Sequence, residues 1–380
     1  MDTWIASAVD EIAARMVPDL EALVAISSPS GDVAAAEACV EVVGRLAPPE
    51  ATIERIPCSS PDYAPDAIVR LTGTNADGAR LLLVGHLDTV FPHERFRPPS
   101  RDANRLGGSG ASDMKSGDVL ALSLLRALVA RRAEFAEVAL LLVMDEESRT
   151  APFAHAERFA GWNACLCFEA GDRDSHENEA VIVRRKAAAT LRVQAHGRAS
   201  HSGSAPDLGR NALLALAAVA QAVAAAHDPH GPDRLTAVPT ILHSGDASNV
   251  VPADGQLLCD LRSDRTGAFE EVRERVPTEV GGARLEPELL RVWPAMDSRA
   301  ATATLIAATS ERLGRPIVAA ARGGASDASH LAPGIALTID GLGPRGSGQH
   351  TDDEFLALDS VRPRAEIALA LTDAVLRGVR

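Results

Sequence analysis

Short, strongly apolar runs separated by helical patterns constrain the fold of this chain more than any other feature. The runs occur at 67–71, 81–85, 138–144, 164–168 and 335–339. A helical pattern at 118–133 lies between the second and third runs. Continuous apolar runs separated by helices are typical of parallel strands that are buried on both faces. The pattern predicts an α/β domain with a mostly parallel sheet flanked by helices.

The pattern changes near residue 180. A strand-like alternation over 180–197 precedes an alanine-rich helix at 212–226, and two more strands lead to a helix at 269–276. This β-α-β-β-α order indicates a compact α+β unit inserted into the first domain. At 380 residues the chain also exceeds one ordinary core. The predicted boundaries are 1–180 with 294–380 for the main domain and 181–293 for the insert.

Composition excludes several classes of partner. The formal net charge of −14 argues against nucleic acid, whose phosphates would be repelled. The N-terminal segment has the spacing of an amphipathic helix rather than of a signal peptide, and the apolar stretch at 212–226 is too short to span a bilayer. We therefore expect no membrane association. The 5 cysteines are scattered and odd in number, which favours a reducing, cytoplasmic location.

Polar side chains follow three of the predicted strands directly. His86 and Asp88 follow the run at 81–85, Glu147 lies in the acidic triplet after the third run, and Glu169 follows the fourth. In an open α/β sheet, ligands collect at the carboxyl ends of the strands. We therefore expect these side chains to meet at one edge of the sheet.

Two glycine-rich loops add Asp113 and His350 to this set. Each residue alone has an ordinary structural interpretation as a loop histidine or a solvated turn. A phosphate-binding loop is excluded because Met114 stands where a glycine would precede Lys115. Taken together, nitrogen and oxygen donors without thiolate favour a site for zinc, cobalt or manganese.

At this point the chain resembles the dinuclear zinc exopeptidases and deacylases, a family that includes glutamate carboxypeptidase, acetylornithine deacetylase and succinyl-diaminopimelate desuccinylase. The resemblance is closest to the glutamate carboxypeptidase branch, because of Glu169 and the stretch at 201–212. Matching stretches, in the family's order, are SSPSGD, GHLDTVFP, GSGASDMKSG, MDEE, FEAGD, HGRASHSGSAPDLGRNA, ASNVVPADG, DLRSD, GGASDA and GLGPRGSGQHTDDE.

The resemblance implies that Asp113 bridges two Zn²⁺ ions per chain, with Co²⁺ or Mn²⁺ as substitutes. His86 and Glu169 would complete the site of one ion, and Glu147 and His350 that of the other. The two ions would hold a bridging hydroxide and polarise the scissile carbonyl together.

The resemblance also assigns roles around the metal ligands. Asp88 would orient His86, and Glu146 would be the general base. The insert would be a lid and dimerisation domain, so that the protein forms a homodimer. Within the insert, His201 would stabilise the oxyanion in the partner's site, and Asn249 and Arg262 would bind the substrate, with the arginine gripping a free carboxylate.

The implied function is a cytoplasmic metallohydrolase that releases a C-terminal amino acid from an amide, with glutamate favoured. An N-acyl-amino-acid deacylase and a non-catalytic binding homologue remain as alternatives. The chain departs from the family directly after Glu147, where the family usually continues with glycine and this chain has Ser148-Arg149-Thr150-Ala151-Pro152. That departure lies beside the metal ligands and bears on substrate preference.

Overall fold

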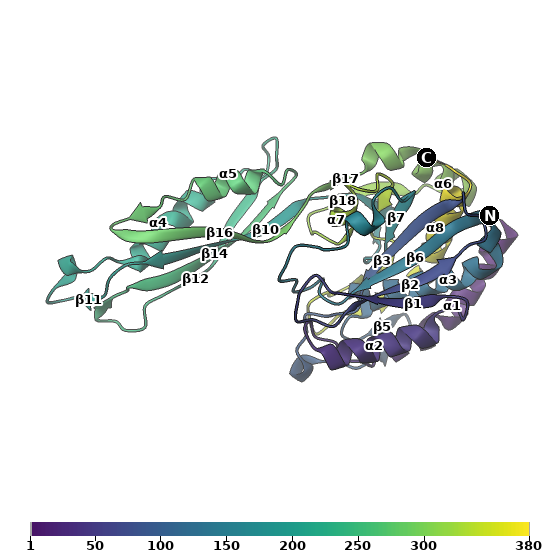
Figure 1. Cartoon of the computed structure of the whole chain (residues 1–380), viewed down its shortest axis with the longest axis horizontal. Helices are drawn as coiled ribbons and strands as arrows, with labels where there is room; N and C mark the ends of the chain where they lie inside the picture. The colour runs from purple at the N-terminus through teal and green to yellow at the C-terminus, as the bar shows by residue number, and fades with distance from the viewer. Residues whose placement is uncertain (1, 380) are drawn as a thin grey trace. The chain divides into compact units, whose positions relative to one another are not determined.

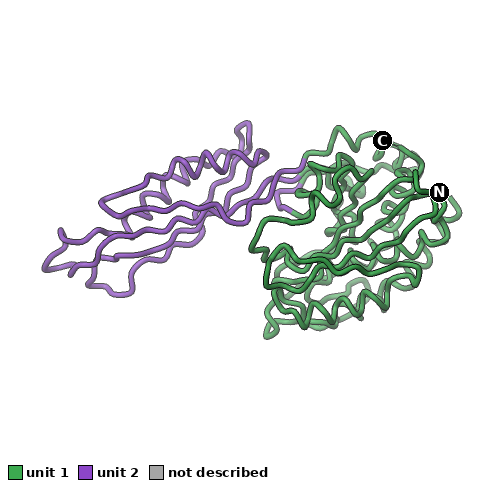
Figure 2. The backbone as a smooth tube through the Cα atoms, in the orientation of Figure 1, with its two compact units in different colours: residues 1–184, 297–321, 326–380 green, residues 185–296, 322–325 purple. Residues whose placement is uncertain are grey.

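The computed structural model describes residues 2–379, and the chain divides into two compact units (Figure 2). Unit 1 contains residues 1–184, 297–321 and 326–380, and unit 2 contains 185–296 and 322–325. Unit 2 is therefore an insertion within unit 1, with one further short segment from the later part of the chain. No described helix has both the length and the hydropathy needed to cross a membrane.

A six-stranded sheet forms the centre of unit 1 (Figure 1). Its strands, in spatial order, are β1 (Thr52–Ile56), β2 (Asp66–Thr72), β6 (Phe135–Val143), β3 (Ala79–His86), β7 (Ala164–Cys167) and β19 (Thr338–Ile339). The strands β6, β3, β7 and β19 pair in parallel, whereas β2 is antiparallel to both of its neighbours.

The α/β class is confirmed, and the antiparallel strand β2 has a simple cause. Only residues 73–78 join β2 to β3, and this connection contains no helix. Two consecutive strands can run parallel in one sheet only if a longer crossover joins them. The short connection therefore makes β3 run in the opposite direction to β2. Because β6 is parallel to β3, it is antiparallel to β2.

Helices pack around this sheet and complete the core of unit 1. Helices α3 and α8 both contact β3, and α1 packs against both of them. The core includes the fully buried Leu81 and Leu83 of β3 and Leu140 and Leu142 of β6. The helices of unit 1 are α1 (Thr3–Val24), α2 (Val33–Leu46), α3 (Ser116–Leu128), α6 (Arg299–Leu313), α7 (Ala328–Leu331) and α8 (Val361–Leu376).

Two small sheets accompany the central sheet. The first has the order β17–β9–β18, with β8 paired to β9, and the second has the order β20–β21–β5–β4. Their bounds are β4 (Ser100–Arg101), β5 (Arg105–Gly107), β8 (Asp172–Arg173), β9 (Glu179–Arg185), β17 (Met296–Asp297), β18 (Val318–Arg322), β20 (Gly346–Ser347) and β21 (Phe355–Ala357). The second sheet joins the two glycine-rich loops, because β5 precedes Asp113 and β20 precedes His350.

Unit 2 is built on a five-stranded antiparallel sheet that shares a separate core with two helices. The spatial order is β12 (Thr236–Ser244), β14 (Asp254–Ser263), β10 (Ala187–His196), β16 (Ala283–Trp293) and β15 (Glu279–Val280). Helices α4 (Ala212–Ala224) and α5 (Ala268–Glu274) contact this sheet, and β11 (Ser200–His201) pairs with β13 (Val250–Val251). The predicted insert, 181–293, includes the residues of β15 and β16, but no strands were predicted there because the sequence has no strongly apolar run.

Candidate metal centre

The predicted metal ligands of unit 1 lie together at the carboxyl ends of the central strands. His86 is the last residue of β3, and Glu169 follows the end of β7. Glu147 follows β6, while Asp113 lies just before α3 and His350 lies in the loop after β20. Parallel pairing of β3 with β6 and β7 aligns these strand ends at one edge. The structure therefore brings all five predicted ligands together.

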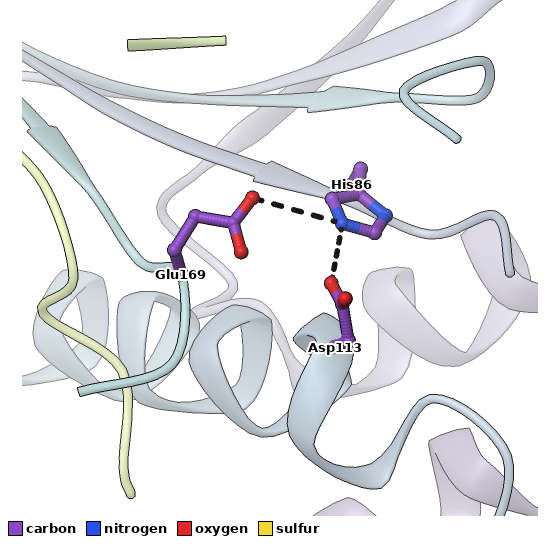
Figure 3. A group of neighbouring side chains, drawn as sticks. All are labelled: His86, Asp113 and Glu169. Carbon is purple, nitrogen blue, oxygen red and sulfur yellow. Dashed lines mark hydrogen bonds and ion pairs between the residues drawn. The ribbon is translucent and has the colours of Figure 1, made fainter. Parts of the chain in front are cut away.

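The two carboxylate oxygens of Asp113 face different histidines. Its Oδ1 lies 3.1 Å from Nε2 of His86, and its Oδ2 lies 3.2 Å from Nε2 of His350. Glu169 Oε1 lies 3.9 Å from Nε2 of His86 on the first side (Figure 3). Glu147 Oε2 lies 3.2 Å from Nε2 of His350 on the second side. Asp113 thus stands between two ligand groups and belongs to both.

These residues fit divalent metal ions by the chemistry and spacing of their donors. The ligand atoms of His86, Asp113 and Glu169 lie within 4.8 Å of one another, as do those of Asp113, Glu147 and His350. Each group offers one imidazole and two carboxylates, a nitrogen and oxygen set that suits zinc, cobalt or manganese. Because Asp113 belongs to both groups, its two carboxylate oxygens would suit a pair of neighbouring ions.

The tautomer of His86 suits metal binding. Its Nδ1 lies 3.1 Å from the backbone carbonyl oxygen of Asp88, which can only accept a hydrogen bond. The Nδ1–H therefore donates to that carbonyl, and Nε2, which faces Asp113, is the nitrogen that would bind an ion after losing its proton. The carboxylate of Asp88 is farther away, with Oδ1 at 3.4 Å from Nδ1. The backbone of Asp88, rather than its side chain, is the nearer partner of this histidine.

The Asp88 carboxylate holds the turn that carries Glu146 and Glu147. Its Oδ1 accepts a hydrogen bond from the Glu146 backbone N–H, and its Oδ2 accepts one from the Glu147 backbone N–H, both at 3.1 Å. The hydroxyl of Ser30 donates to Oδ2 at 2.6 Å. Asp88 therefore links β3 to the acidic turn after β6, a contact that the sequence did not indicate.

Burial and crowding of carboxylates control the electrostatics of the site. Burial raises the pKa of Glu146 well above its ordinary value, and the nearby carboxylates of Glu169 and Asp327 add to the rise. Burial opposes ionisation of Asp113, but hydrogen bonds from His350 and His86 outweigh it and lower the pKa. Hydrogen bonds to Asp113 and Glu147 raise the pKa of His350 to about 10. A cluster with this excess of negative charge favours bound cations.

Glu354 is a buried residue beside the site that received no role from the sequence. Its carboxylate accepts hydrogen bonds from the backbone N–H groups of Gly110, Ser112 and Asp113 at 2.8–2.9 Å. Burial raises the pKa of Glu354 to about 7. In the sequence it lies four residues after His350, at the end of the matching stretch GLGPRGSGQHTDDE. The peptide bond between Asp113 and Met114, in the loop that Glu354 holds, is cis.

The remaining predicted site residues lie in unit 2. His201 is exposed in β11, and its Nδ1 accepts hydrogen bonds from the backbone N–H groups of Gly203 and Ser204 at 3.1 and 3.2 Å. Asn249 is exposed in the turn before β13. Arg262 lies in β14, where its guanidinium pairs with Asp260 at 3.0 Å. Unit 1 therefore assembles the predicted metal ligands without these three residues.

Comparison with known proteins identifies related sequences over most of the chain. Residues 82–374 match the profile of Peptidase family M20/M25/M40. Carboxypeptidase G2 of Pseudomonas sp. is 27% identical over 315 residues, covering 77% of this chain and 73% of the relative. A succinyl-diaminopimelate desuccinylase of Methylobacterium sp. is 28% identical over 362 residues, covering 88% and 89%.

Solved structures share the fold across nearly the full length. A tripeptidase from Staphylococcus aureus superposes with a TM-score of 0.77 at 19% identity, covering 96% of this chain and 99% of the other. The YXEP protein of Bacillus subtilis, described as a dinuclear metal-binding peptidase of the M20 family, superposes with a TM-score of 0.70 at 15% identity, covering 97% and 99%. At these identities the likeness concerns the fold.

Proposed function

The chain belongs to peptidase family M20/M25/M40 and is a hydrolase of amide bonds, and from this premise we propose that it is a dinuclear zinc carboxypeptidase. Its substrate would be an N-acylated amino acid or peptide, from which it releases a C-terminal amino acid that keeps its carboxylate. Glutamate is the favoured leaving group. The observation that carries the proposal is the Asp113 carboxylate, whose two oxygens face His86 and His350 separately.

This proposal gives Glu146 and His201 defined catalytic roles. Bound divalent ions would polarise the scissile carbonyl and lower the pKa of a water molecule. Glu146, with its raised pKa, accepts a proton from the attacking water and passes it to the departing amine. The geometry of His201 supports its role, because Nδ1 accepts two backbone hydrogen bonds and the neutral ring carries its proton on Nε2. That N–H can donate to the developing oxyanion.

Substrate binding would fall to Arg262 and Asn249. A guanidinium binds a carboxylate in a bidentate manner, and Arg262 already holds the carboxylate of Asp260 through Nε and Nη2. A substrate carboxylate would replace Asp260 as the partner of this arginine. Asn249 would contribute an amide contact to the substrate from its exposed turn.

We further propose a cytoplasmic homodimer that forms through unit 2. Strand β12 is an edge strand that exposes Ile241 and Leu242, and the adjacent helix α4 exposes Leu213 and Leu214. Unpaired edge groups next to exposed apolar side chains favour association with a second copy. Within residues 2–379 the five cysteines form no disulfide bond, which agrees with a reducing compartment. Sedimentation of the protein with Ile241→Glu tests the dimer and should yield monomer.

A substrate panel tests the activity directly. The zinc-, cobalt- and manganese-loaded protein is assayed against folyl- and peptidyl-glutamates, N-succinyl and N-acetyl amino acids, and the matching C-terminal amides. The proposal predicts cleavage of glutamate conjugates and loss of activity when the terminal carboxylate is amidated. Equal cleavage of the amides would contradict it.

A second candidate is an N-acyl-amino-acid deacylase that uses the same chemistry. It is favoured by the desuccinylase relatives, one of which covers 88% of this chain. The same panel separates the two functions. Preference for a particular acyl group, with indifference to the amino acid released, would identify the deacylase.

A further inference from the structure

Arg149 is a buried arginine two residues after the proposed metal ligand Glu147. Its side chain is only 4% exposed. Its Nε donates to Asp145 Oδ1 at 3.0 Å, and its two terminal nitrogens donate to the two carboxylate oxygens of Asp327 at 2.7 and 3.1 Å. The bidentate pairing fixes the plane of the guanidinium. Arg149 therefore cannot turn toward a substrate without breaking these contacts.

Other contacts extend this ion pair into a network. The guanidinium carbon lies 4.9 Å from the ring centre of Phe153, which stacks on His330 with a centroid distance of 5.0 Å. On the other side, Asp145 accepts hydrogen bonds from the backbone N–H and the hydroxyl of Ser60 at 2.9 and 2.8 Å. Arg149 thus joins the acidic turn to the segment after β1 and to α7.

The residues held by this network lie on either side of the proposed general base and of one proposed metal ligand. Glu146 and Glu147 lie between Asp145 and Arg149, and Asp88 holds their backbone N–H groups at 3.1 Å. The turn is therefore fixed from one side by Asp88 and from the other by Arg149. Loss of the Arg149 side chain would remove the contacts on the second side.

We infer that Arg149 is a positioning residue that fixes the acidic turn to Asp327 and thereby holds the carboxylates of Glu146 and Glu147 for metal binding and proton transfer. The inference rests on the proposed function for its catalytic part only. A buried ion pair is weak evidence for stability by itself, whereas fixing a unique geometry is a better-attested use. Groups that orient metal ligands change metal affinity or activity by about 10–100-fold when they are removed.

The test compares Arg149→Met and Arg149→Lys with Arg126→Met. Arg126 is a matched control, because it is mostly buried and paired with Asp19 at 2.8 Å between α3 and α1. We measure thermal stability, zinc affinity by chelator competition, and hydrogen exchange of residues 144–151 in the metal-free protein. For the active enzyme we also measure kcat and KM separately.

Arg149→Met should weaken zinc binding and lower kcat by about 10–100-fold, with a much smaller change in KM, and should speed exchange of the turn. Arg149→Lys should lie between the wild type and the methionine variant, because lysine keeps the charge but not the bidentate fork. Arg126→Met should reduce only thermal stability.

Wild-type zinc affinity, exchange and kcat in Arg149→Met would overturn the inference, as would equal changes in Arg126→Met. If the wild-type protein cleaves no substrate, the proposed function fails on its own. The zinc and exchange measurements then still decide whether Arg149 positions the turn.

Discussion

The predicted functional residues of unit 1 and unit 2 differ in how firmly the surrounding protein holds them. In unit 1, the side chains of His86, Asp113 and Glu147 are 1%, 18% and 7% exposed, and all of them contact one another or His350, which is itself 54% exposed. In unit 2, His201 is exposed in β11 and Asn249 is exposed in the turn before β13. The difference agrees with the proposed division of roles, in which unit 1 would bind the metal ions and unit 2 would bind the substrate.

Variants of the two units should therefore separate metal binding from turnover. Asp113→Asn in unit 1 should have the largest effect, because it removes a ligand from both groups at once. We expect loss of activity by at least about 10³-fold together with loss of bound metal. Metal content and hydrolysis are measured on the same sample. Asp77→Asn, in an exposed loop before β3, is the control and should keep both.

Glu146→Gln should separate metal binding from turnover by a change within unit 1. Loss of a general base typically costs about 10²–10⁴-fold in rate. The amide keeps the shape of the side chain, and Glu146 belongs to neither ligand group, so metal content should stay at the wild-type level. Unchanged kcat in this variant would remove Glu146 from the mechanism. The exposed Glu157→Gln, in the segment after the acidic turn, controls for loss of a surface charge.

His201→Ala tests the same separation of metal binding from turnover by a change in unit 2. Removing one donor to an oxyanion costs about 10²–10³-fold in kcat. Zinc affinity should not change, because all five proposed metal ligands lie in unit 1. Metal loss in this variant would contradict the proposed division of roles. His230→Ala, also exposed in unit 2, should behave as the wild type.

Arg262→Lys should have the smallest effect of the four. Lysine keeps the charge but loses bidentate geometry, so we expect KM for carboxylate substrates to rise by about 10-fold with little change in kcat. Substrates with an amidated C-terminus should not discriminate between the variant and the wild type. Arg192→Lys, on the neighbouring strand β10 and paired with Glu288, is the matched control.

The sequence could predict three of the proposed metal ligands because they lie at or just after the carboxyl ends of strands. Strongly apolar runs located β3, β6 and β7, and the polar residues that follow them had to meet at one edge of the sheet. Asp113 and His350 lie in loops, so their place in the site depended on the resemblance as well as on residue type. The roles assigned to these residues remain predictions for the experiments above.

Other features left weaker signals in the sequence. The strand-like stretch at 180–197 is broken at Lys186 into β9 and β10, which belong to different sheets. In strand β16 only Ala283, Leu285 and Trp293 are buried, and the strand has no long apolar run. The pairing of Arg149 with Asp327 joins residues 178 positions apart, so no local pattern could indicate it. Contacts between residues far apart in the sequence depend on tertiary packing, whereas the ends of strands can be located from local sequence patterns.

A crystal structure of the zinc-loaded protein, with anomalous scattering recorded at the zinc edge, tests the central claim most directly. The account predicts two zinc peaks about 3.5–4 Å apart. One should be bound by His86 and Glu169 and the other by Glu147 and His350, with Asp113 between them. A single peak, or peaks away from Asp113, would contradict the dinuclear site.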